Sequence, residues 1–90
     1  MKTIAISENE TTLAPLGTKV KGKVAVSVPF GFWADVGLNR QAFVDLRYIP
    51  IKGKPRIPQP GERIEGVIIR YVEDEPRLSM LPEHIKNPPI

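Results

Sequence analysis

The sequence predicts an all-β domain, a small antiparallel barrel or sandwich of five strands with little helix. The chain has 90 residues, which is the length of one domain. Apolar and polar residues alternate in short runs, and turn residues separate these runs about every ten positions. Ten prolines and seven glycines favour turns over helices. Together these observations indicate short strands joined by tight connections.

The first expected strand starts near Gly17, where cationic and apolar residues alternate: Lys19, Val20, Lys21, Gly22, Lys23 and Val24. Gly22 interrupts the apolar row, and a glycine inside a strand usually marks a bend or a close approach of another backbone. The other strands are expected at 32–36, 41–46, 63–72 and 77–81, with a single helical turn at 47–50. The first strand is therefore predicted to be strongly bent.

The second strand separates its side chains onto two faces, because successive residues of a strand point in opposite directions. Phe32 and Ala34 share one face, and we expect them, with Phe43 of the third strand, in the core. Trp33 then lies outside. It is either an exposed surface for a ligand or the packing site of the N-terminal residues.

The chain divides into a folded part and two tails. Residues 1–15 are mostly polar and aperiodic, so we expect a mobile extension. Residues 16–81 contain all five expected strands and form the domain. Residues 82–90 are rich in proline and are expected to be a flexible C-terminal tail that lies beyond the fold.

The sequence lacks the residue types or spacings that several classes of function require. Without cysteine there are no disulfides, thiolate catalysis or zinc ribbons. His84 is the single histidine and has no second ligand at a motif spacing, so no metal site is expected. No serine has a catalytic partner at a motif spacing, and no phosphate loop or cofactor motif occurs. Neither a signal peptide nor a membrane span is recognisable. We therefore expect a non-catalytic protein of the cytoplasm.

The charge is concentrated in the expected domain. The net charge is +3, and residues 16–81 carry eleven Lys and Arg against seven Asp and Glu. Lys21 and Lys23 of the first strand are candidate phosphate contacts, although such rows are more often plain solvated faces. A proline-rich loop adds three further cations as a secondary basic site: Lys52, Lys54 and Arg56.

Five segments resemble, in order and spacing, the S1 family of RNA-binding domains. They are Gly17–Val24, Phe30–Gly37, Ala42–Leu46, Pro60–Ile64 and Arg77–Ser79, and the resemblance covers about residues 16–81. It implies a five-stranded antiparallel OB-fold barrel that binds single-stranded RNA by stacking bases on surface aromatics. Single-stranded DNA is an alternative ligand. By register, the family's binding residues fall on Phe30, Trp33, Asp45 and Arg77, with its acid on Val72 or Glu73.

The sequence departs from the family at two places on this face. Asp45 stands at a histidine position, and Glu73, Asp74 and Glu75 form an acidic turn. Arg77 either contacts RNA or pairs with Asp74 or Glu75. These departures predict a divergent member with weak, largely sequence-tolerant RNA binding. The alternative is a protein-interaction module, or an accessory subunit of a translation or RNA-processing complex.

Overall fold

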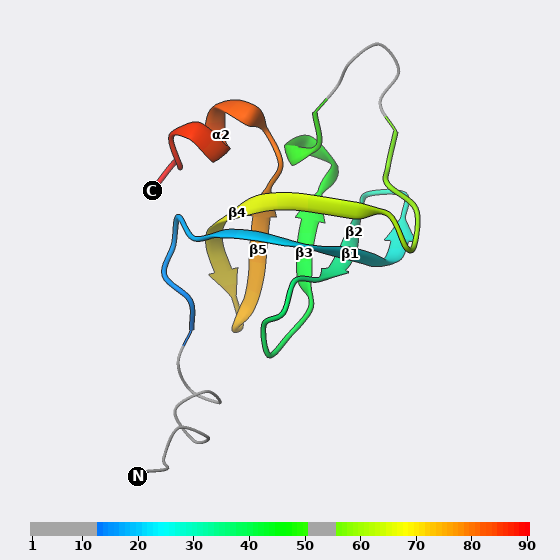
Figure 1. The fold of residues 1–90 in the computed structure, drawn as a ribbon, viewed down its shortest axis with the longest axis horizontal. Coiled ribbons are helices and arrows are strands. Elements are labelled where there is room, and N and C mark those ends of the chain that lie inside the picture. Colours follow the sequence, from blue (N-terminus) through cyan, green and yellow to red (C-terminus); the bar gives the residue numbers. More distant parts are fainter. Residues whose placement is uncertain (1–12, 51–55) are drawn as a thin grey trace, which may run out of the picture.

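Five strands form a closed barrel in the computed structural model, which describes residues 13–50 and 56–90 (Figure 1). In chain order the elements are β1 (Lys19–Val28), β2 (Gly31–Asp35), β3 (Ala42–Asp45), η1 (Leu46–Tyr48), β4 (Arg63–Val72), β5 (Glu75–Ser79) and α2 (Pro82–Lys86). Around the barrel the strand order is β1-β2-β3-β5-β4, and β4 returns to pair with β1. The predicted all-β barrel of five strands is thus confirmed, and the sandwich alternative is wrong.

One strand pair departs from the expected antiparallel pattern. β3 and β5 are parallel, whereas the other four neighbouring pairs are antiparallel. The reason is geometric. Strand directions cannot alternate at every neighbour around a closed ring with an odd number of strands, so one pair must run parallel.

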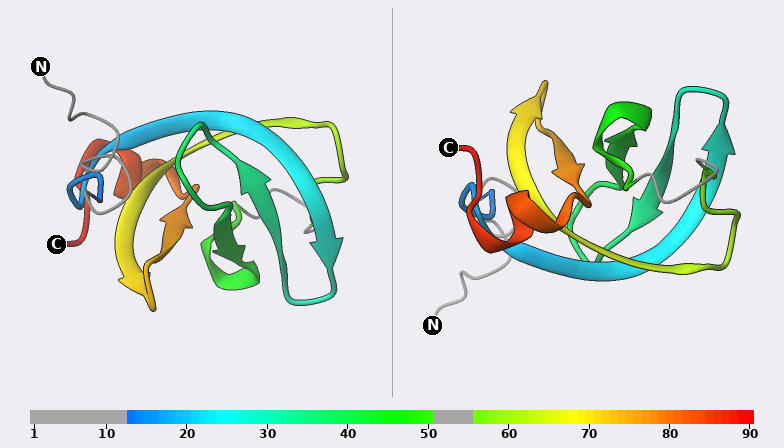
Figure 2. Two further views of the ribbon diagram at one scale, coloured as in Figure 1. Left: turned by 90° about the horizontal axis from the view of Figure 1, so that it is seen from below. Right: turned by 90° about the horizontal axis from the view of Figure 1, so that it is seen from above.

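The first strand is long and curved, and it joins the two sides of the barrel. Its first half pairs with β4, its second half pairs with β2, and a bulge lies between Val24 and Val26 (Figure 2). The bend depends on Gly22. A Cβ at this position would lie 1.9 Å from the backbone oxygen of Asp35. The close backbone approach that the sequence predicted at Gly22 is therefore present.

The core follows the predicted alternation of side chains. Phe32 and Ala34 of β2 are fully buried, as are Val44, Ile68 and Leu78 from β3, β4 and β5. These side chains point inward from four different strands, so burial of one face of each strand closes the barrel.

The C-terminal residues do not form the tail that the sequence analysis expected directly after Leu81. Instead, α2 begins at Pro82, and the residues after it lie beside the segment before β1, where Gly17 faces Pro88 and Ile90. The proline count suggested an irregular segment, but proline at the first helical position favours a helix because its fixed φ suits the first turn. The C-terminal boundary of the fold thus differs from the expected one.

A buried serine connects this helix to the barrel. Ser79 is fully buried, its Oγ lies 2.8 Å from His84 Nδ1, and it accepts a hydrogen bond from the Leu81 amide. The His84 ring also packs near the Tyr48 ring of η1, with centroids 5.9 Å apart. The single histidine therefore has a structural environment made by α2, β5 and η1.

We expect the substitution Ser79→Ala to destabilise the protein by about 1–3 kcal/mol, because it leaves the Leu81 amide without its acceptor. Thermal unfolding measures this change, and hydrogen exchange should show faster opening of α2 than of β2. The matched control is Thr18→Ala, since the Thr18 hydroxyl donates an exposed hydrogen bond to the Pro15 carbonyl. Equal stabilities of the two variants would contradict the anchoring role of Ser79.

At the N-terminal side, the described chain starts against the barrel. The Tyr71 hydroxyl donates a hydrogen bond to the Ala14 carbonyl at 2.6 Å, and Ala14 packs on the core. The remainder of the expected extension, residues 1–12, lies outside the described residues, as do Lys52 and Lys54 of the expected basic loop.

Candidate nucleic-acid interface

Three aromatic rings meet on the outer surface of β2 and β3. Trp33 pairs with Phe43 across these strands, and their ring centroids are 4.7 Å apart. Phe30, in the turn before β2, lies 5.8 Å from Phe43 and 6.4 Å from Trp33, with its plane nearly perpendicular to the tryptophan. We call Phe30, Trp33 and Phe43 the aromatic platform.

The members of the aromatic platform differ in exposure. Phe30 is 57% exposed, Trp33 is half-buried, and Phe43 is only 5% exposed beneath them. The family resemblance indicated Phe30 and Trp33 as the binding aromatics, and the structure places both rings on the outer surface. Trp33 is partly covered by neighbouring side chains of the barrel itself.

Phe43 is buried as expected, but on the outer side of the barrel and not in its interior. The ring is buried, but it is not part of the core cluster inside the barrel. Ala42 and Val44 point inward, so Phe43 between them must point outward. The sequence contained this signal: Phe43 and Asp45 are two residues apart, and a strand that presents one on its outer face presents the other there too.

Glu75 of β5 connects the platform to Arg77. Its Oε2 accepts a hydrogen bond from Trp33 Nε1 at 2.9 Å, and its Oε1 accepts one from Arg77 Nε at 2.9 Å. The Arg77 guanidinium lies 5.2 Å from the centre of the Phe43 ring, within the range of a cation–π contact. The predicted alternative in which Arg77 pairs with an acid is therefore present, with Glu75 as its partner.

The acidic residue at the platform is Glu75, whereas the spacing of the family pattern indicated Val72 or Glu73. Val72 ends β4, and Glu73 starts a tight turn in which Glu73 and Asp74 have φ values of 49° and 67°. Two successive residues with positive φ make the two-residue hairpin turn that matches strand twist. Because this turn is so short, Glu75 is already on β5 and points to the same side as Arg77.

Asp45 is near the platform but is engaged by its own chain. It pairs with Gly31 across β2 and β3, and its Oδ1 accepts hydrogen bonds from the Arg47 amide at 3.0 Å and from Arg47 Nε at 3.3 Å. The amide contact caps η1. This hydrogen bond, together with the Arg47 and Arg70 charges, holds the pKa of Asp45 below its ordinary value, against a smaller opposing effect of burial.

We expect the substitution Asp45→Asn to lower stability by less than about 1 kcal/mol at neutral pH, because the ion pair with Arg47 is largely exposed. The folded state lowers the pKa, so the carboxylate contributes stability above its unfolded pKa, and this contribution is lost as pH falls through the folded pKa. The two proteins should therefore differ at pH 7 and converge as the pH falls below the range in which aspartate ordinarily titrates. Thermal melts across this range measure the difference, and a gap that widens toward low pH would contradict the assignment.

The lysines of β1 lie on a different part of the barrel surface. Lys21 and Lys23 are exposed, and they pair in register with Glu65 and Arg63 of β4. Lys23 also pairs with Asp35 of β2, which is two residues beyond Trp33 on the same outer face. The structure thus brings Lys23 near the platform and places Lys21 one step farther from it.

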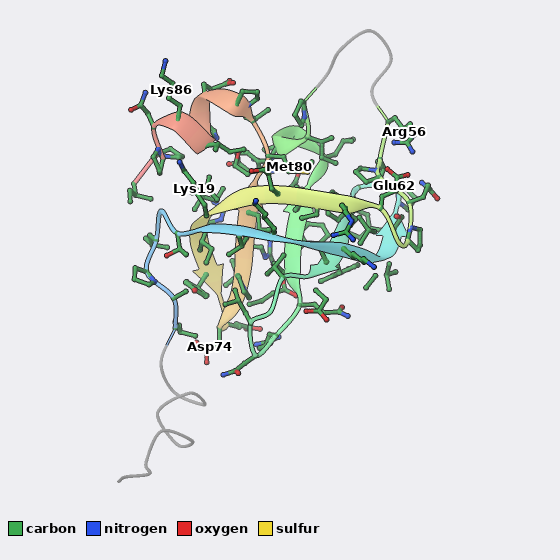
Figure 3. The ribbon with its side chains drawn as sticks, in the orientation of Figure 1. Lys19, Arg56, Glu62, Asp74, Met80 and Lys86 are labelled. Carbon is green, nitrogen blue, oxygen red and sulfur yellow. The ribbon has the colours of Figure 1, made fainter. Side chains whose placement is uncertain are left out.

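Arg56 is the only member of the expected basic loop within the described residues. It forms an ion pair with Glu62, and this contact, with the Gln59 amide, lowers the pKa of Glu62. Figure 3 shows Arg56 and Glu62 at one end of the molecule and Asp74 at another. Arg56 is therefore already paired with a carboxylate.

Sequence reasoning missed two further cations. Arg70 of β4 pairs in register with Arg77 of β5, and it is exposed. Arg63 is exposed beside Lys23. For Arg70, the bulge in β4 between Ile68 and Arg70 shifts the alternation that would have assigned its face.

The described part of the chain contains no group of three acidic or histidine side chains arranged to hold a metal ion. Nor does any helix in residues 13–50 and 56–90 have the length and apolar character needed to cross a membrane.

A closed barrel of five strands in this order, whose described residues add only one short helix after β3 and one after β5, is an OB-fold. No family model matches the sequence, and no curated protein matches it. Comparison with solved structures shows what the fold is similar to.

One similar chain belongs to the crystal structure of an a/eIF2alpha–aDim2p–rRNA complex from Pyrococcus horikoshii, with a TM-score of 0.67 and 14% identity over 83% of this chain. RNase R from Mycoplasma genitalium, solved alone and with ribose-methylated single-stranded RNA, gives a TM-score of 0.63 and 13% identity over 73% of this chain. An uncharacterized protein from Methanocaldococcus jannaschii gives a TM-score of 0.63 and 16% identity, covering 79% of this chain and 97% of that one.

The present chain spans 51% of the length of the first of these structures and 13% of RNase R. At identities of 13–16%, these similarities establish the OB-fold.

Proposed function

We propose that this protein binds single-stranded RNA on the aromatic platform, as a divergent S1-type module without catalytic activity. The observation that carries the proposal is the contact of three aromatic rings on the outer barrel surface, with Phe30 exposed at its edge. Exposed aromatic side chains that stack unpaired bases are the common device of single-strand binding on OB-folds.

The platform favours single strands because bases must be unstacked from a duplex before a side chain can stack on them. Stacking contributes about 1–3 kcal/mol per base and is tolerant of sequence, since every base has a π-face. Phe30 offers the most open ring and Trp33 the largest one, so we propose that these two receive bases.

Weak binding follows from the charges at the platform. Arg77 lies over Phe43, but its charge is offset by the hydrogen-bonded Glu75 carboxylate. Phosphate would have to compete with this partly buried pair. Asp45 adds a second negative charge near Phe30. A single module of this kind is expected to bind RNA with modest affinity unless a partner or a second site adds avidity.

The similar structures support the proposal at the level of fold. Two of them were solved as complexes with RNA, one with rRNA and one with single-stranded RNA. The five sequence segments that resemble the S1 family supply a second, independent line of support, because four of the residues they indicate lie around one surface: Phe30, Trp33, Asp45 and Arg77.

A protein-interaction role is the second candidate, and a group of exposed apolar side chains favours it. Leu13, Leu16 and Ile90 are exposed near the end of the barrel where the described N-terminal residues and the C-terminus meet. Such side chains can mark an interface with another protein. A partner that remains bound after nuclease treatment and is released by Leu16→Asp would favour this role.

Trp33 itself provides the test of RNA binding, because it is the only tryptophan. Titration with single-stranded RNA at low and at moderate salt should quench its fluorescence in a saturable way, with weaker binding at the higher salt. An RNA duplex of the same length is the control and should bind less. A flat titration at low salt would rule out the proposal and leave protein interaction as the better candidate.

A further inference from the structure

We infer that the β1–β4 surface holds a separate site for the phosphate backbone, formed by Lys23 and Arg63 with Lys21 beside them. This inference rests on the proposed function, because the occupant is the stretch of a single strand that leaves the aromatic platform. It assigns the phosphate contacts mainly to this surface and not to Arg77. We call these three cations the basic site.

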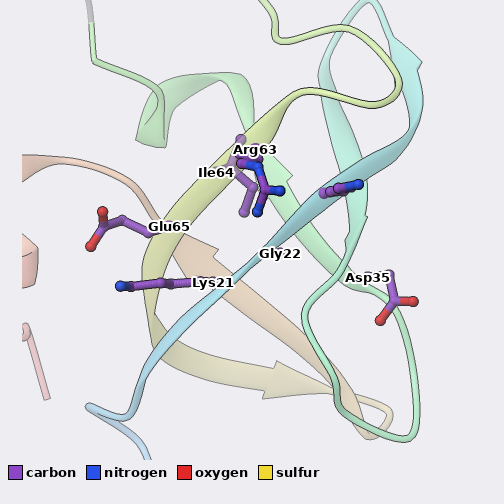
Figure 4. A pocket seen from close by; sticks show the side chains of 7 residues that line it. Lys21, Gly22, Asp35, Arg63, Ile64 and Glu65 are labelled. Carbon is purple, nitrogen blue, oxygen red and sulfur yellow. The ribbon is translucent and has the colours of Figure 1, made fainter.

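The basic site is a shallow open depression on the outside of the barrel. Its lining consists of Lys21, Gly22, Lys23, Asp35, Arg63, Ile64 and Glu65, contributed by β1, β4 and the end of β2 (Figure 4). Lys23 and Arg63 are direct partners in the β1–β4 register, so their side chains leave neighbouring positions. An open depression with cations from two strands suits an extended backbone better than a small enclosed molecule.

The charges in the basic site are available, in contrast to those at the platform. Within the described residues, the ion pairs are Arg47–Asp45, Arg56–Glu62 and Arg77–Glu75, and none includes Lys21, Lys23 or Arg63. A cation that is not paired with a carboxylate can neutralise a phosphate directly, and the counterions that this releases from the RNA drive association. At the platform, Arg77 would first have to break its ion pair with Glu75 before it could bind a phosphate.

Two acids also line the depression, but neither neutralises the cations directly. Asp35 Oδ1 accepts a hydrogen bond from the Gly37 amide at 3.0 Å, and Figure 4 shows its carboxylate directed away from Arg63. Glu65 is the register partner of Lys21 and forms no ion pair with it. Lys21 is therefore the most compensated of the three, and Lys23 and Arg63 carry the proposed site.

The position of Lys23 connects the basic site to the platform. Lys23 pairs with Asp35, while the platform residue Trp33 pairs with Val26 farther along β1. Trp33 and Asp35 share a face of β2 and are two residues apart, a distance of about 7 Å along a strand. A single-stranded RNA with one base on Trp33 thus needs only a short extension to place its next phosphates over the basic site.

The length of the RNA separates the two sites experimentally. An oligouridylate of about ten nucleotides can cover both surfaces, given typical OB-fold site sizes, whereas a trinucleotide can occupy the platform alone. We would measure both ligands by Trp33 fluorescence over a series of salt concentrations. The variants are Lys23→Gln and Arg63→Gln, and the matched control is Lys86→Gln, an exposed lysine on α2 (Figure 3).

Each of the two variants should weaken binding of the long RNA about threefold or more, and should reduce the slope of log affinity against log salt by about 0.7. Trinucleotide binding should not change. Long-RNA affinity and slope equal to those of Lys86→Gln would overturn the basic site while leaving the platform intact. Equal loss for both RNA lengths would also overturn it, because the cations would then act at the platform. No binding of either RNA by the unmodified chain would overturn the site and the proposed function together.

Discussion

The substitution Gly22→Ala is expected to destabilise the protein by more than about 3 kcal/mol, the largest effect among the single changes considered for its stability. The added Cβ would lie 1.9 Å from the Asp35 carbonyl oxygen and 2.8 Å from the Val36 Cα, both of which are backbone atoms. The clash cannot be relieved by turning a side chain. It requires β1 and β2 to separate at the point where β1 changes partners.

Gly37→Ala is the matched control, because it tests glycine loss without a steric clash. Gly37 has a φ of +83°, and its added Cβ would meet nothing within 4 Å. The expected cost is about 1–2 kcal/mol from the left-handed conformation alone. Chemical denaturation of the unmodified protein, Gly22→Ala and Gly37→Ala measures the free energy of unfolding of each. A Gly22→Ala protein as stable as Gly37→Ala would contradict the description of β1 as a strand bent around a close backbone contact.

The substitution Phe30→Ala is expected to produce the largest loss of RNA affinity for the smallest structural change. Loss of one stacked base corresponds to about 1–3 kcal/mol, or roughly 5- to 150-fold in affinity. Phe30 is 57% exposed and lies in a turn, so its removal should have little effect on the melting temperature. Fluorescence titration of Trp33 measures the affinity, and thermal unfolding verifies the fold.

Leu16→Ala serves as the control for Phe30→Ala, since Leu16 is also a large exposed apolar residue but lies before β1, away from the platform. It should bind RNA as the unmodified protein does. If Phe30→Ala retained full affinity, bases would not stack on this ring. Trp33 would then be the one ring of the platform left to receive a base.

The strands and their inner faces could be predicted from the sequence because alternation is a local property. Phe32 and Ala34 are two residues apart on one short strand, and no other part of the chain is needed to place them on the same face. Gly22 is similar. A missing side chain in an otherwise regular row indicates a close approach, although the sequence does not name Asp35 as the neighbour.

The details of the platform depend on how strands are paired, and pairing was not visible. Glu75 reaches Trp33 across 42 positions of sequence, because β5 lies next to β3 in the barrel. The two-residue turn at Glu73 and Asp74 decides which acid faces the platform, and a turn one residue longer would have turned Glu75 to the other face. Counting along the family pattern therefore indicated Val72 or Glu73.

The C-terminal helix shows a different limit of sequence reasoning. Prolines usually interrupt regular structure, but Pro82 occupies the first position of α2, where a missing amide hydrogen has no cost. The helix is only five residues long and is stabilised by contacts with Ser79 and Tyr48. Such contacts belong to the folded barrel and leave no periodic signal in the sequence.

The most direct test of RNA binding at the platform is an NMR titration that follows the single indole N–H signal of the chain. In the free protein this Trp33 group donates to Glu75, so its resonance reports on the centre of the platform. On addition of single-stranded RNA we predict that this signal shifts, together with the amides of Phe30 and Phe43, while those of α2 remain in place. RNA-dependent shifts confined to another surface, or no shifts at low salt, would contradict the account.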